Sequence, residues 1–298
     1  MRIALGTAQF GLNYGISNAQ GLTGTAELAQ ILELSRKSGI DTLDTAPAYG
    51  ESESVLGNLN VKGFRIVSKL PSEIPEGVSV AGWVVKSVNT SLLRLNQDNL
   101  HGILLHRPAQ LFEANGDAIY HSLQELKAGG LVDKIGVSIY DARELIKLFK
   151  HFDFDLIQAP LSIFDQRLIT SGWLNRLVSE GIEVHVRSIF LQGLLLMQEE
   201  ERPIKFKRWN KLWRDWYEWL DEYGLTAMEV CTRYVLSIPG VERVIVGVQS
   251  SRQLGEILEV ASRGHIDAPS FLPVNSDELL NPSRWTSLSG SEASVFDS

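Results

Sequence analysis

Four ionisable side chains stand at or just after the ends of three successive apolar segments of the sequence. They are Asp44, Tyr49, Lys69 and His106. An acid and a lysine in apolar segments are costly unless they pair, so we expect Asp44 and Lys69 to form a buried ion pair. A cation near the hydroxyl of Tyr49 favours the phenolate and should lower the pKa of that tyrosine from about 10. Such a tyrosine can protonate a developing alkoxide while His106 polarises a carbonyl oxygen, which is the chemistry of carbonyl reduction.

Each of these residues also has an ordinary structural interpretation. Asp44 could cap a turn, Tyr49 could be a packed aromatic residue with a hydrated hydroxyl, and His106 could be a satisfied polar side chain. Lys69 could extend to solvent, or it could be the Schiff-base lysine of an aldolase or isomerase barrel. We favour the joint chemical interpretation because all four side chains would meet at one end of a parallel sheet.

The elements that would position these residues are short apolar strands and amphipathic helices. The expected strands are residues 3–8, 42–46, 65–70, 102–106, 135–139, 156–161, 183–189 and 243–248. Such near-continuous apolar runs are typical of a parallel sheet covered on both faces. The first expected helix has Thr25 as its N-cap and stops at Gly39, and the others are 79–95, 113–128, 141–150, 166–180, 209–222, 226–237 and 251–262.

This alternation of strands and helices favours a single (β/α)8 TIM barrel over a doubly wound sheet. In such barrels the active site lies at the carboxyl ends of the strands, where the four residues stand. The widest gap between expected strands contains the aromatic and basic segment 205–220. We interpret this segment as an amphipathic helix on the barrel, with a substrate-covering loop or a subunit contact as the alternatives.

Composition and charge bound the class of protein. The chain has 298 residues, of which 44% are apolar, and 28 Lys and Arg against 36 Asp and Glu give a net charge of −8. This acidic balance argues against nucleic-acid binding and against a polybasic membrane face, and no apolar run is long enough to span a bilayer. The single cysteine, Cys231, excludes an intramolecular disulfide framework and a multi-cysteine zinc site.

We therefore expect one cytoplasmic domain over residues 1–298, without a metal and with a loosely ordered tail from about residue 283. The sequence leaves the oligomeric state open.

The motifs along the chain resemble those of the aldo-keto reductase superfamily, in the same order from the first strand to the last helix. They are LGTAQFG (5–11), LDTAPAYGESESVLG (43–57), IVSKL (66–70), LLHRP (104–108), IGVSIY (135–140), LIQAPLSIFDQR (156–167), RSIFLQGLL (187–195) and VIVGVQSSRQLGEI (244–257). The resemblance implies a (β/α)8 barrel that reduces a small carbonyl substrate, an aldehyde or ketone, with NAD(P)H. It also implies a catalytic tetrad of Asp44, Tyr49, Lys69 and His106 with Tyr49 as the general acid.

The same resemblance implies the residues that contact the cofactor. They are Gly6, Thr7, Asp44, Ser138, Gln158, Arg187, Ser188, Phe190, Leu191, Gly193, Gly247, Gln249, Gln253 and Glu256. Ile139 departs from the family, in which an asparagine is common. Arg187 stands where many members place an aromatic ring against the nicotinamide, so it could stack on that ring, meet an anionic substrate or pair with a nearby acid.

The sequence does not decide between NADPH and NADH. Members that prefer NADPH often carry Lys or Arg for the 2′-phosphate, where this chain has Gly247, Gln249 and Gln253. Family habit nevertheless favours NADPH, with NADH as the alternative.

Two other functions stay open beside carbonyl reduction. One is a cofactor-binding sensor or regulatory barrel with little turnover, and the other is the Lys69 Schiff-base aldolase or isomerase. The sequence RSIFLQGLLL also resembles reductase-like proteins of bacterial surface-polysaccharide pathways, so the expected carbonyl substrate is small or sugar-like.

Overall fold

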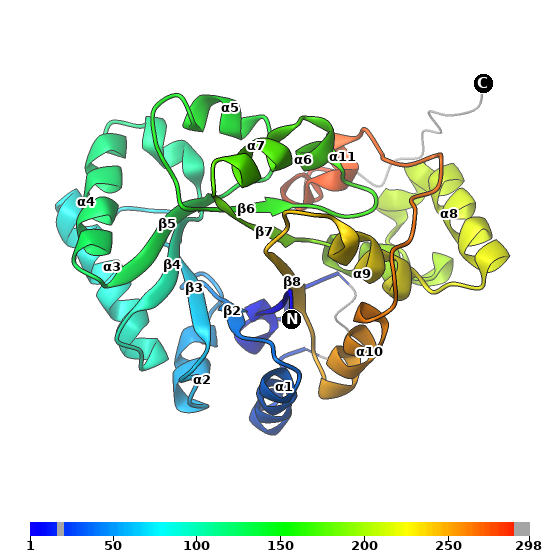
Figure 1. Ribbon diagram of the computed structural model, residues 1–298, viewed down its shortest axis with the longest axis horizontal. Helices are drawn as coiled ribbons and strands as arrows, with labels where there is room; N and C mark the ends of the chain where they lie inside the picture. Colours follow the sequence, from blue (N-terminus) through cyan, green and yellow to red (C-terminus); the bar gives the residue numbers. More distant parts are fainter. Residues whose placement is uncertain (17–20, 289–298) are drawn as a thin grey trace.

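The fold is a closed barrel of parallel strands surrounded by helices (Figure 1). The computed structural model describes residues 1–16 and 21–288. The strands are β1 (Ile3–Gly6), β2 (Thr42–Asp44), β3 (Arg65–Leu70), β4 (Leu100–Leu105), β5 (Val132–Ser138), β6 (Leu156–Pro160), β7 (Glu183–Arg187) and β8 (Arg243–Gly247). Each strand pairs with its neighbours in the sequence and β8 closes the ring on β1, which confirms the predicted TIM barrel.

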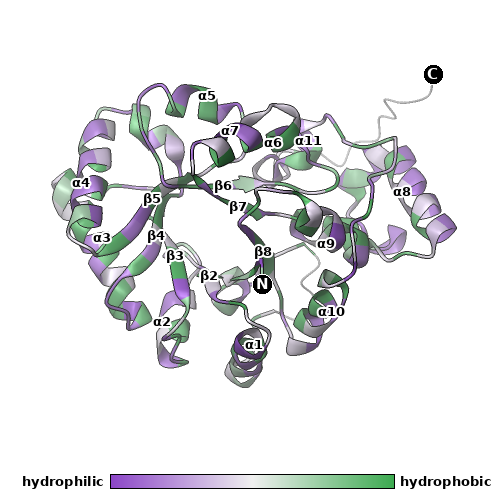
Figure 2. Cartoon of the chain, in the orientation of Figure 1, coloured by the Kyte–Doolittle hydropathy of each residue, from purple (hydrophilic) through white to green (hydrophobic). Residues whose placement is uncertain are grey.

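Helices cover the outside of this ring. They are α1 (Thr25–Lys37), α2 (Ser52–Asn58), α3 (Val80–Leu95), α4 (Gly116–Ala128), α5 (Glu144–Leu148), α6 (Arg167–Thr170), α7 (Trp173–Ser179), α8 (Asn210–Tyr223), α9 (Ala227–Ser237), α10 (Ser251–Ala261) and α11 (Asp277–Leu280). Figure 2 shows hydrophobic residues along the strands and on the helix sides next to them. No helix in the described part of the chain is long and apolar enough to cross a bilayer.

Three helical features differ from those expected from the sequence. No helix is expected from the sequence at α2, because its seven residues are too few to show a full apolar stripe along one face. The helix expected over 166–180 is divided into α6 and α7, because Gly172 between them has a left-handed φ of 78°. The N-cap of α1 is Gly24 and not Thr25, which is already the first helical residue.

The segment 205–220 contains the expected amphipathic helix, α8, on one side of the barrel (Figure 1). Its residues Trp213, Trp216 and Leu220 are buried. The ring of Trp213 stacks on Phe164 with centroids 5.9 Å apart, so α8 is anchored by its aromatic face.

The segment after α11 is packed against the protein. The side chain of Trp285 is 3% exposed, and its ring lies 4.9 Å from that of Phe206. Its indole N–H donates to the carbonyl oxygen of Leu279 at 3.0 Å. The expectation of a loose tail is therefore wrong for residues 283–288, because a large aromatic side chain is buried there. Residues 289–298, the remainder of that expected tail, lie outside the described residues.

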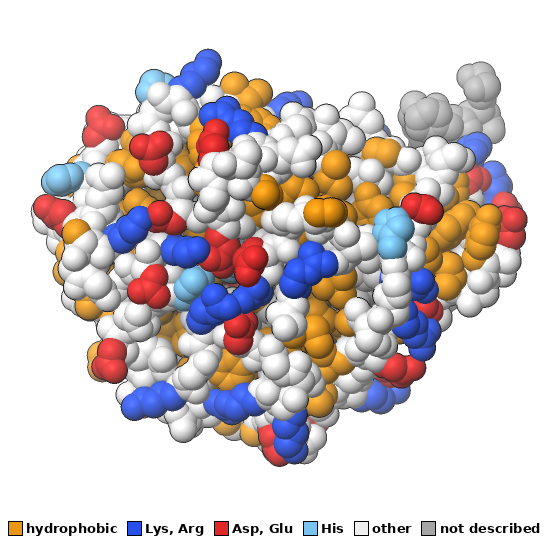
Figure 3. Space-filling view, viewed as in Figure 1, with side chains coloured by type: hydrophobic (Ala, Val, Ile, Leu, Met, Phe, Trp, Pro, Cys, Tyr) orange, Lys and Arg blue, Asp and Glu red, His pale blue; other side chains and the backbone are white. Residues whose placement is uncertain are grey.

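Charged and histidine side chains close the end of the barrel where the strands begin. Glu183, the first residue of β7, accepts hydrogen bonds from His101 at 3.1 Å, from His185 at 2.6 Å and from Lys134. Burial acts to raise the pKa of Glu183, but these hydrogen bonds outweigh it and hold the pKa below the ordinary value of 4.5. Figure 3 shows acidic, basic and histidine side chains gathered near the middle of the molecule.

We expect Glu183→Gln to lower the free energy of unfolding by about 1–3 kcal/mol at pH 7, because the donors lose a charged acceptor. A folded-state pKa below the unfolded one means that this stabilisation is complete above about pH 4.5 and is lost as the pH falls. The difference in the free energy of unfolding between wild type and variant, measured by urea unfolding, should therefore become smaller in acid. Glu180→Gln, which breaks an exposed pair with Arg176, is the control. An equal loss in both variants would contradict the assignment.

Candidate active site

A buried ion pair lies where the strands end. Asp44, the last residue of β2, and Lys69 in β3 have side chains that are 6% and 1% exposed. The ammonium of Lys69 donates to both Asp44 oxygens and to the carbonyl oxygen of Thr45, each at 2.9 Å. Burial acts to lower the pKa of Lys69, but the Asp44 carboxylate outweighs it, so the pKa is raised and the amine stays protonated. The ion pair expected from the sequence is present, and it opposes a nucleophilic amine.

Side chains from β5 and β6 hold the carboxylate from another side. The hydroxyl of Ser138 bonds the amide oxygen of Gln158 at 2.8 Å, and the amide nitrogen of Gln158 donates to Asp44 at 2.6 Å. All three side chains are buried. The orientation of the Asp44 carboxylate is therefore fixed by Lys69 of β3 and Gln158 of β6, and Ser138 of β5 in turn orients Gln158. Separately, Val67, Leu104 and Leu156 form a small apolar cluster in the barrel strands.

Tyr49 lies next to the ammonium of Lys69 and the imidazole of His106. The ring centre of Tyr49 is 4.9 Å from the Lys69 nitrogen, and its ring meets that of His106 edge to face at 6.1 Å. Burial raises the pKa of Tyr49 and outweighs the lowering effect of Lys69. The lowered pKa expected from the sequence is therefore wrong in direction, because burial of the phenol outweighs the attraction of Lys69, and Asp44 offsets part of that attraction. A raised pKa keeps the phenol protonated at neutral pH, which is the form that donates a proton.

His106, the residue after β4, is kept neutral by its surroundings. Burial lowers its pKa to about 4, and the nearby Lys69 ammonium adds to this effect. Its Nδ1 atom is buried without a hydrogen-bond partner among the described residues. Unpaired buried polar atoms are rare outside sites where another molecule completes the contact. A neutral imidazole here can orient a carbonyl oxygen without adding charge.

Two glycines bring the loop after β1 into backbone contact with the turn that carries Tyr49. A Cβ atom on Gly11 would lie 1.9 Å from the carbonyl oxygen of Tyr49, and one on Gly50 would lie 2.4 Å from the carbonyl oxygen of Gly11. Gly50 also has a left-handed φ of 58°. The hydroxyl of Ser52 ties the two segments further by donating to the carbonyl oxygen of Thr7 at 2.9 Å. Side chains at either glycine would push Tyr49 away from Lys69.

An open cleft of about 430 Å³ runs from Asp44 and Tyr49 to the first turns of α10. The residues expected at the cofactor that line it are Gly6, Thr7, Asp44, Arg187, Ser188, Phe190, Gly193, Gly247, Gln249, Gln253 and Glu256. Ser138 and Gln158 instead lie behind Asp44, and Leu191 is 1% exposed within the core. Met228 and Ile257 also line the cleft. Ile257 stands where the family frequently has an asparagine, whereas nothing in the local sequence marks Met228.

The loop after β7 forms one wall of the cleft with a constrained backbone. Ser188, Leu191 and Gln192 have left-handed φ angles of 64°, 48° and 55°, and Gly193 follows at 94°. Such angles cost on the order of 1 kcal/mol or more per non-glycine residue and cluster where loops hold ligands. The amide of Gln192 donates to the hydroxyl of Tyr14 at 3.1 Å, which joins this wall to the loop after β1. This hydrogen bond between the two loops is not expected from the sequence.

Arg187, the last residue of β7, is the only Lys or Arg among the described residues that line the cleft. Its guanidinium donates to the carbonyl oxygen of Ile139 at 2.8 Å and to the hydroxyl of Ser188 at 3.2 Å. It also lies 4.7 Å from the ring centre of Tyr140. Within the described part of the chain it pairs with no acid, so the interpretation of Arg187 as the partner of a nearby carboxylate is wrong.

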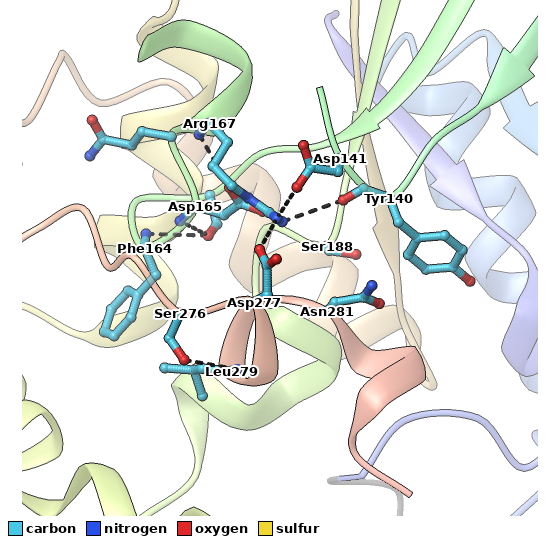
Figure 4. Close-up of polar contacts among 12 residues, drawn as sticks. Tyr140, Asp141, Phe164, Asp165, Arg167, Ser188, Ser276, Asp277, Leu279 and Asn281 are labelled. Atoms are coloured by element: carbon cyan, nitrogen blue, oxygen red, sulfur yellow. Dashed lines mark hydrogen bonds and ion pairs between the residues drawn. The ribbon is translucent and has the colours of Figure 1, made fainter. Parts of the chain in front are cut away.

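The nearby acids are bound by two other arginines, Arg167 and Arg143. Figure 4 shows Arg167 with Asp141, Asp165 and Asp277. Arg167, the first residue of α6, donates to Asp141, Asp165 and Asp277 at distances between 2.7 and 2.9 Å. Arg143 shares Asp141 and Asp277 with it. Because Asp277 begins α11, these pairs fasten the C-terminal segment to the loops after β5 and β6. Arg187 is left as a cation without a carboxylate partner among residues 1–16 and 21–288.

Comparison with known proteins finds relatives along most of the chain. The sequence profile of the aldo/keto reductase family matches residues 2–272. Aldo-keto reductase YhdN of Bacillus subtilis (strain 168) is 24% identical over 291 residues, which cover 87% of this chain and 84% of that protein. The 6-dehydroglucose reductase of Agrobacterium fabrum is 29% identical over 200 residues, and the match spans 60% of each chain. The NADH-specific methylglyoxal reductase of Escherichia coli (strain K12) is 27% identical over 241 residues, covering 70% of this chain and 71% of that protein.

Solved structures share the same architecture. Aldo-keto reductase AKR11C1 from Bacillus halodurans, in its holo form, matches with a TM-score of 0.70 and 20% identity, covering 90% of this chain and 88% of that one. The putative aldo-keto reductase PA4992 from Pseudomonas aeruginosa matches with a TM-score of 0.65 and 23% identity, covering 88% of this chain and 90% of that one. At these identities the likeness concerns the fold alone.

Proposed function

Because the chain belongs to the aldo/keto reductase family, we propose that it reduces an aldehyde or ketone to an alcohol with a nicotinamide nucleotide as the hydride donor. One arrangement supports the proposal most strongly. The phenol of Tyr49 lies over the buried pair of Asp44 and Lys69 and beside the neutral His106, at one end of a cleft of about 430 Å³.

The residues that are present fit a dinucleotide. The cleft is long, and three glycines along it, Gly6, Gly193 and Gly247, let an extended ligand lie against the backbone. We propose that the nicotinamide end is held by Arg187, the pyrophosphate by Ser188, Phe190 and Gly193, and the adenosine end by Gly247, Gln249, Gln253 and Glu256, with Gly6, Thr7 and Asp44 along the floor. Ser138, Gln158 and Leu191 do not line the cleft, so in this proposal they support its walls and do not touch the nucleotide. When bound, the reduced nicotinamide supplies the hydride.

In this proposal the chain's own residues handle the proton. Tyr49 donates its hydroxyl proton to the carbonyl oxygen as negative charge develops there. Lys69, held protonated by Asp44, stabilises the phenolate that remains. His106, neutral at pH 7, directs the carbonyl oxygen toward the phenol by a hydrogen bond.

We propose a sugar-like aldehyde or ketone as the substrate class and the cytoplasm as the location. The support for the substrate comes from two relatives that act on sugars, the 6-dehydroglucose reductase and a D-threo-aldose 1-dehydrogenase of a Pseudomonas species. The Schiff-base alternative is opposed by Lys69, whose side chain is 1% exposed and whose pKa is raised. The sensor alternative is opposed by the intact proton-transfer arrangement.

The proposal is tested by incubating the protein with NADH or NADPH and a panel of aldoses, ketoses and small aldehydes. We expect one alcohol to form for each nucleotide oxidised. Tight nucleotide binding without turnover across the whole panel would favour the sensor, and a borohydride-trapped substrate adduct on Lys69 would favour the aldolase or isomerase.

The pH dependence of reduction should follow Tyr49 and His106. Reduction needs a protonated Tyr49, whose pKa is raised above 10.0, and a neutral His106, whose pKa is about 4. We therefore expect kcat/KM to be level through neutral pH, to fall in acid near pH 4 as the imidazole gains a proton, and to fall in alkali above pH 10 as the phenol loses one. Circular dichroism at each pH separates these steps from unfolding. An acid limb centred near 6.5, the ordinary pKa of histidine, would contradict the desolvated imidazole.

A further inference from the structure

The cleft has a second end, at the start of α10, away from the proton-transfer residues. Gln249, Gln253 and Glu256 line it there. A dinucleotide that occupies the cleft with its reactive ring at Tyr49 has its adenosine at this second end. The chemistry around α10 therefore decides whether a 2′-phosphate or only a 2′-hydroxyl is accepted on the adenosine ribose.

Protein acceptors already occupy three peptide N–H groups at the start of α10. The N–H of Ser251 donates to the Glu27 carboxylate at 2.5 Å, that of Gln249 to the side-chain oxygen of Gln253 at 2.8 Å, and that of Gln253 to the hydroxyl of Ser250 at 3.2 Å. Free N–H groups at a helix start attract phosphate. The N–H groups of Gln249, Ser251 and Gln253 are already bonded, and that of Ser251 binds a carboxylate of the protein.

The remaining charge at this end is also unfavourable for a phosphate. Glu27 accepts a second hydrogen bond from the Ser251 hydroxyl at 2.8 Å, and these bonds lower the pKa of Glu27, so it is ionised at neutral pH. Glu256 adds a second carboxylate. Arg252 is 83% exposed in its side chain and lies 3.9 Å from Glu256.

We propose that this end of the cleft selects NADH over NADPH, with Glu27 as the specificity-determining residue. The inference rests on the proposed function, because that function places the adenosine ribose at α10. A 2′-phosphate at this end meets the carboxylate of Glu256, which lines the cleft, and lies near that of Glu27, which is held on Ser251 at the start of α10. No Lys or Arg lines this end in the described residues, so the phosphate is repelled. A 2′-hydroxyl is neutral and donates a hydrogen bond that carboxylate or amide oxygens accept. The preference for NADPH drawn from family habit is reversed by this chain's own residues.

Equilibrium binding tests the inference without turnover. Calorimetric titration of the full chain at low salt should give a Kd for NADPH at least about tenfold higher than that for NADH, and added salt should narrow the gap. Glu27→Gln keeps the size and one acceptor oxygen, so it should tighten NADPH binding about fivefold and change NADH binding less than about twofold. Gln253→Arg adds a cation at this end, so it should also lower the Kd for NADPH relative to the Kd for NADH. This second variant tests the inference even if Glu27→Gln disturbs the start of α10.

Glu33→Gln is the matched control, because Glu33 lies on α1 like Glu27 but is exposed and pairs with Lys37. Glu33→Gln should leave the ratio of the Kd for NADPH to the Kd for NADH unchanged. NADPH binding as tight as NADH binding, or a ratio that neither Glu27→Gln nor Gln253→Arg alters, overturns the inference while carbonyl reduction with either nucleotide keeps the proposed function. Failure of both nucleotides to bind overturns the proposed function and this inference with it.

Discussion

Tyr49→Phe is expected to lower kcat for carbonyl reduction by about 10²- to 10⁴-fold. The substitution removes the donated proton but keeps the ring that contacts His106 and lies near Lys69. Binding of the nucleotide involves no proton transfer, so its Kd should change less than about twofold. Single-turnover oxidation of bound NADH or NADPH by a good aldehyde, followed by stopped-flow absorbance, measures the chemical step directly.

Tyr120→Phe is the control for loss of a tyrosine hydroxyl elsewhere. The hydroxyl of Tyr120 donates to the carbonyl oxygen of Asp153 at 2.8 Å and does not line the cleft. This variant should keep the wild-type single-turnover rate. A Tyr49→Phe protein within about threefold of wild type would remove Tyr49 from the acid role.

Lys69→Met is expected to lower the free energy of unfolding by about 3–5 kcal/mol and to abolish measurable reduction. It leaves the carboxylate of Asp44 buried, with the amide of Gln158 as its remaining side-chain donor. The double variant Asp44→Asn/Lys69→Met replaces both charges by neutral groups, so it should regain most of the stability and none of the activity. Urea unfolding followed by tryptophan fluorescence gives the stabilities.

Arg176→Met is the matched comparison for a pair in water. Arg176 and Glu180 lie four residues apart with side chains that are 50% and 40% exposed, so the loss should be less than about 1 kcal/mol. A double variant as unstable as Lys69→Met would show that the unpaired charge is not the cause. A double variant that still reduces aldehydes would show that Tyr49 acts without this pair.

The barrel could be predicted because its strands are local patterns. Segments such as 3–8 and 243–248 are almost continuously apolar, which is typical of a parallel sheet covered on both faces. The alternation of strands and helices places Asp44, Lys69 and His106 at the carboxyl ends of three strands. A parallel barrel brings these ends together, so the meeting of the three side chains could be predicted. Seven-residue α2 could not be predicted, because it is shorter than the periodicity that reveals a helix.

The electrostatic details could not be predicted in the same way. The direction of the Tyr49 pKa depends on a balance between burial and a cation that Asp44 already neutralises, and both are known only from three-dimensional packing. The contact between Glu27 and Ser251 joins residues 224 positions apart. No local pattern in the sequence marks such a contact, on which the proposed choice of NADH depends.

The close approach of Gly11 to the turn of Tyr49 limits how this protein can be re-engineered. The two backbones leave no room for a Cβ atom at Gly11 or Gly50, so Tyr49, the acid of the proposed function, cannot be shifted to suit a bulkier ketone. Libraries that aim at a new substrate range should therefore leave residues 11 and 49–50 untouched and vary the loops after β3 and β4. The proton donor then serves as a fixed reference point around which the rest of the pocket is exchanged.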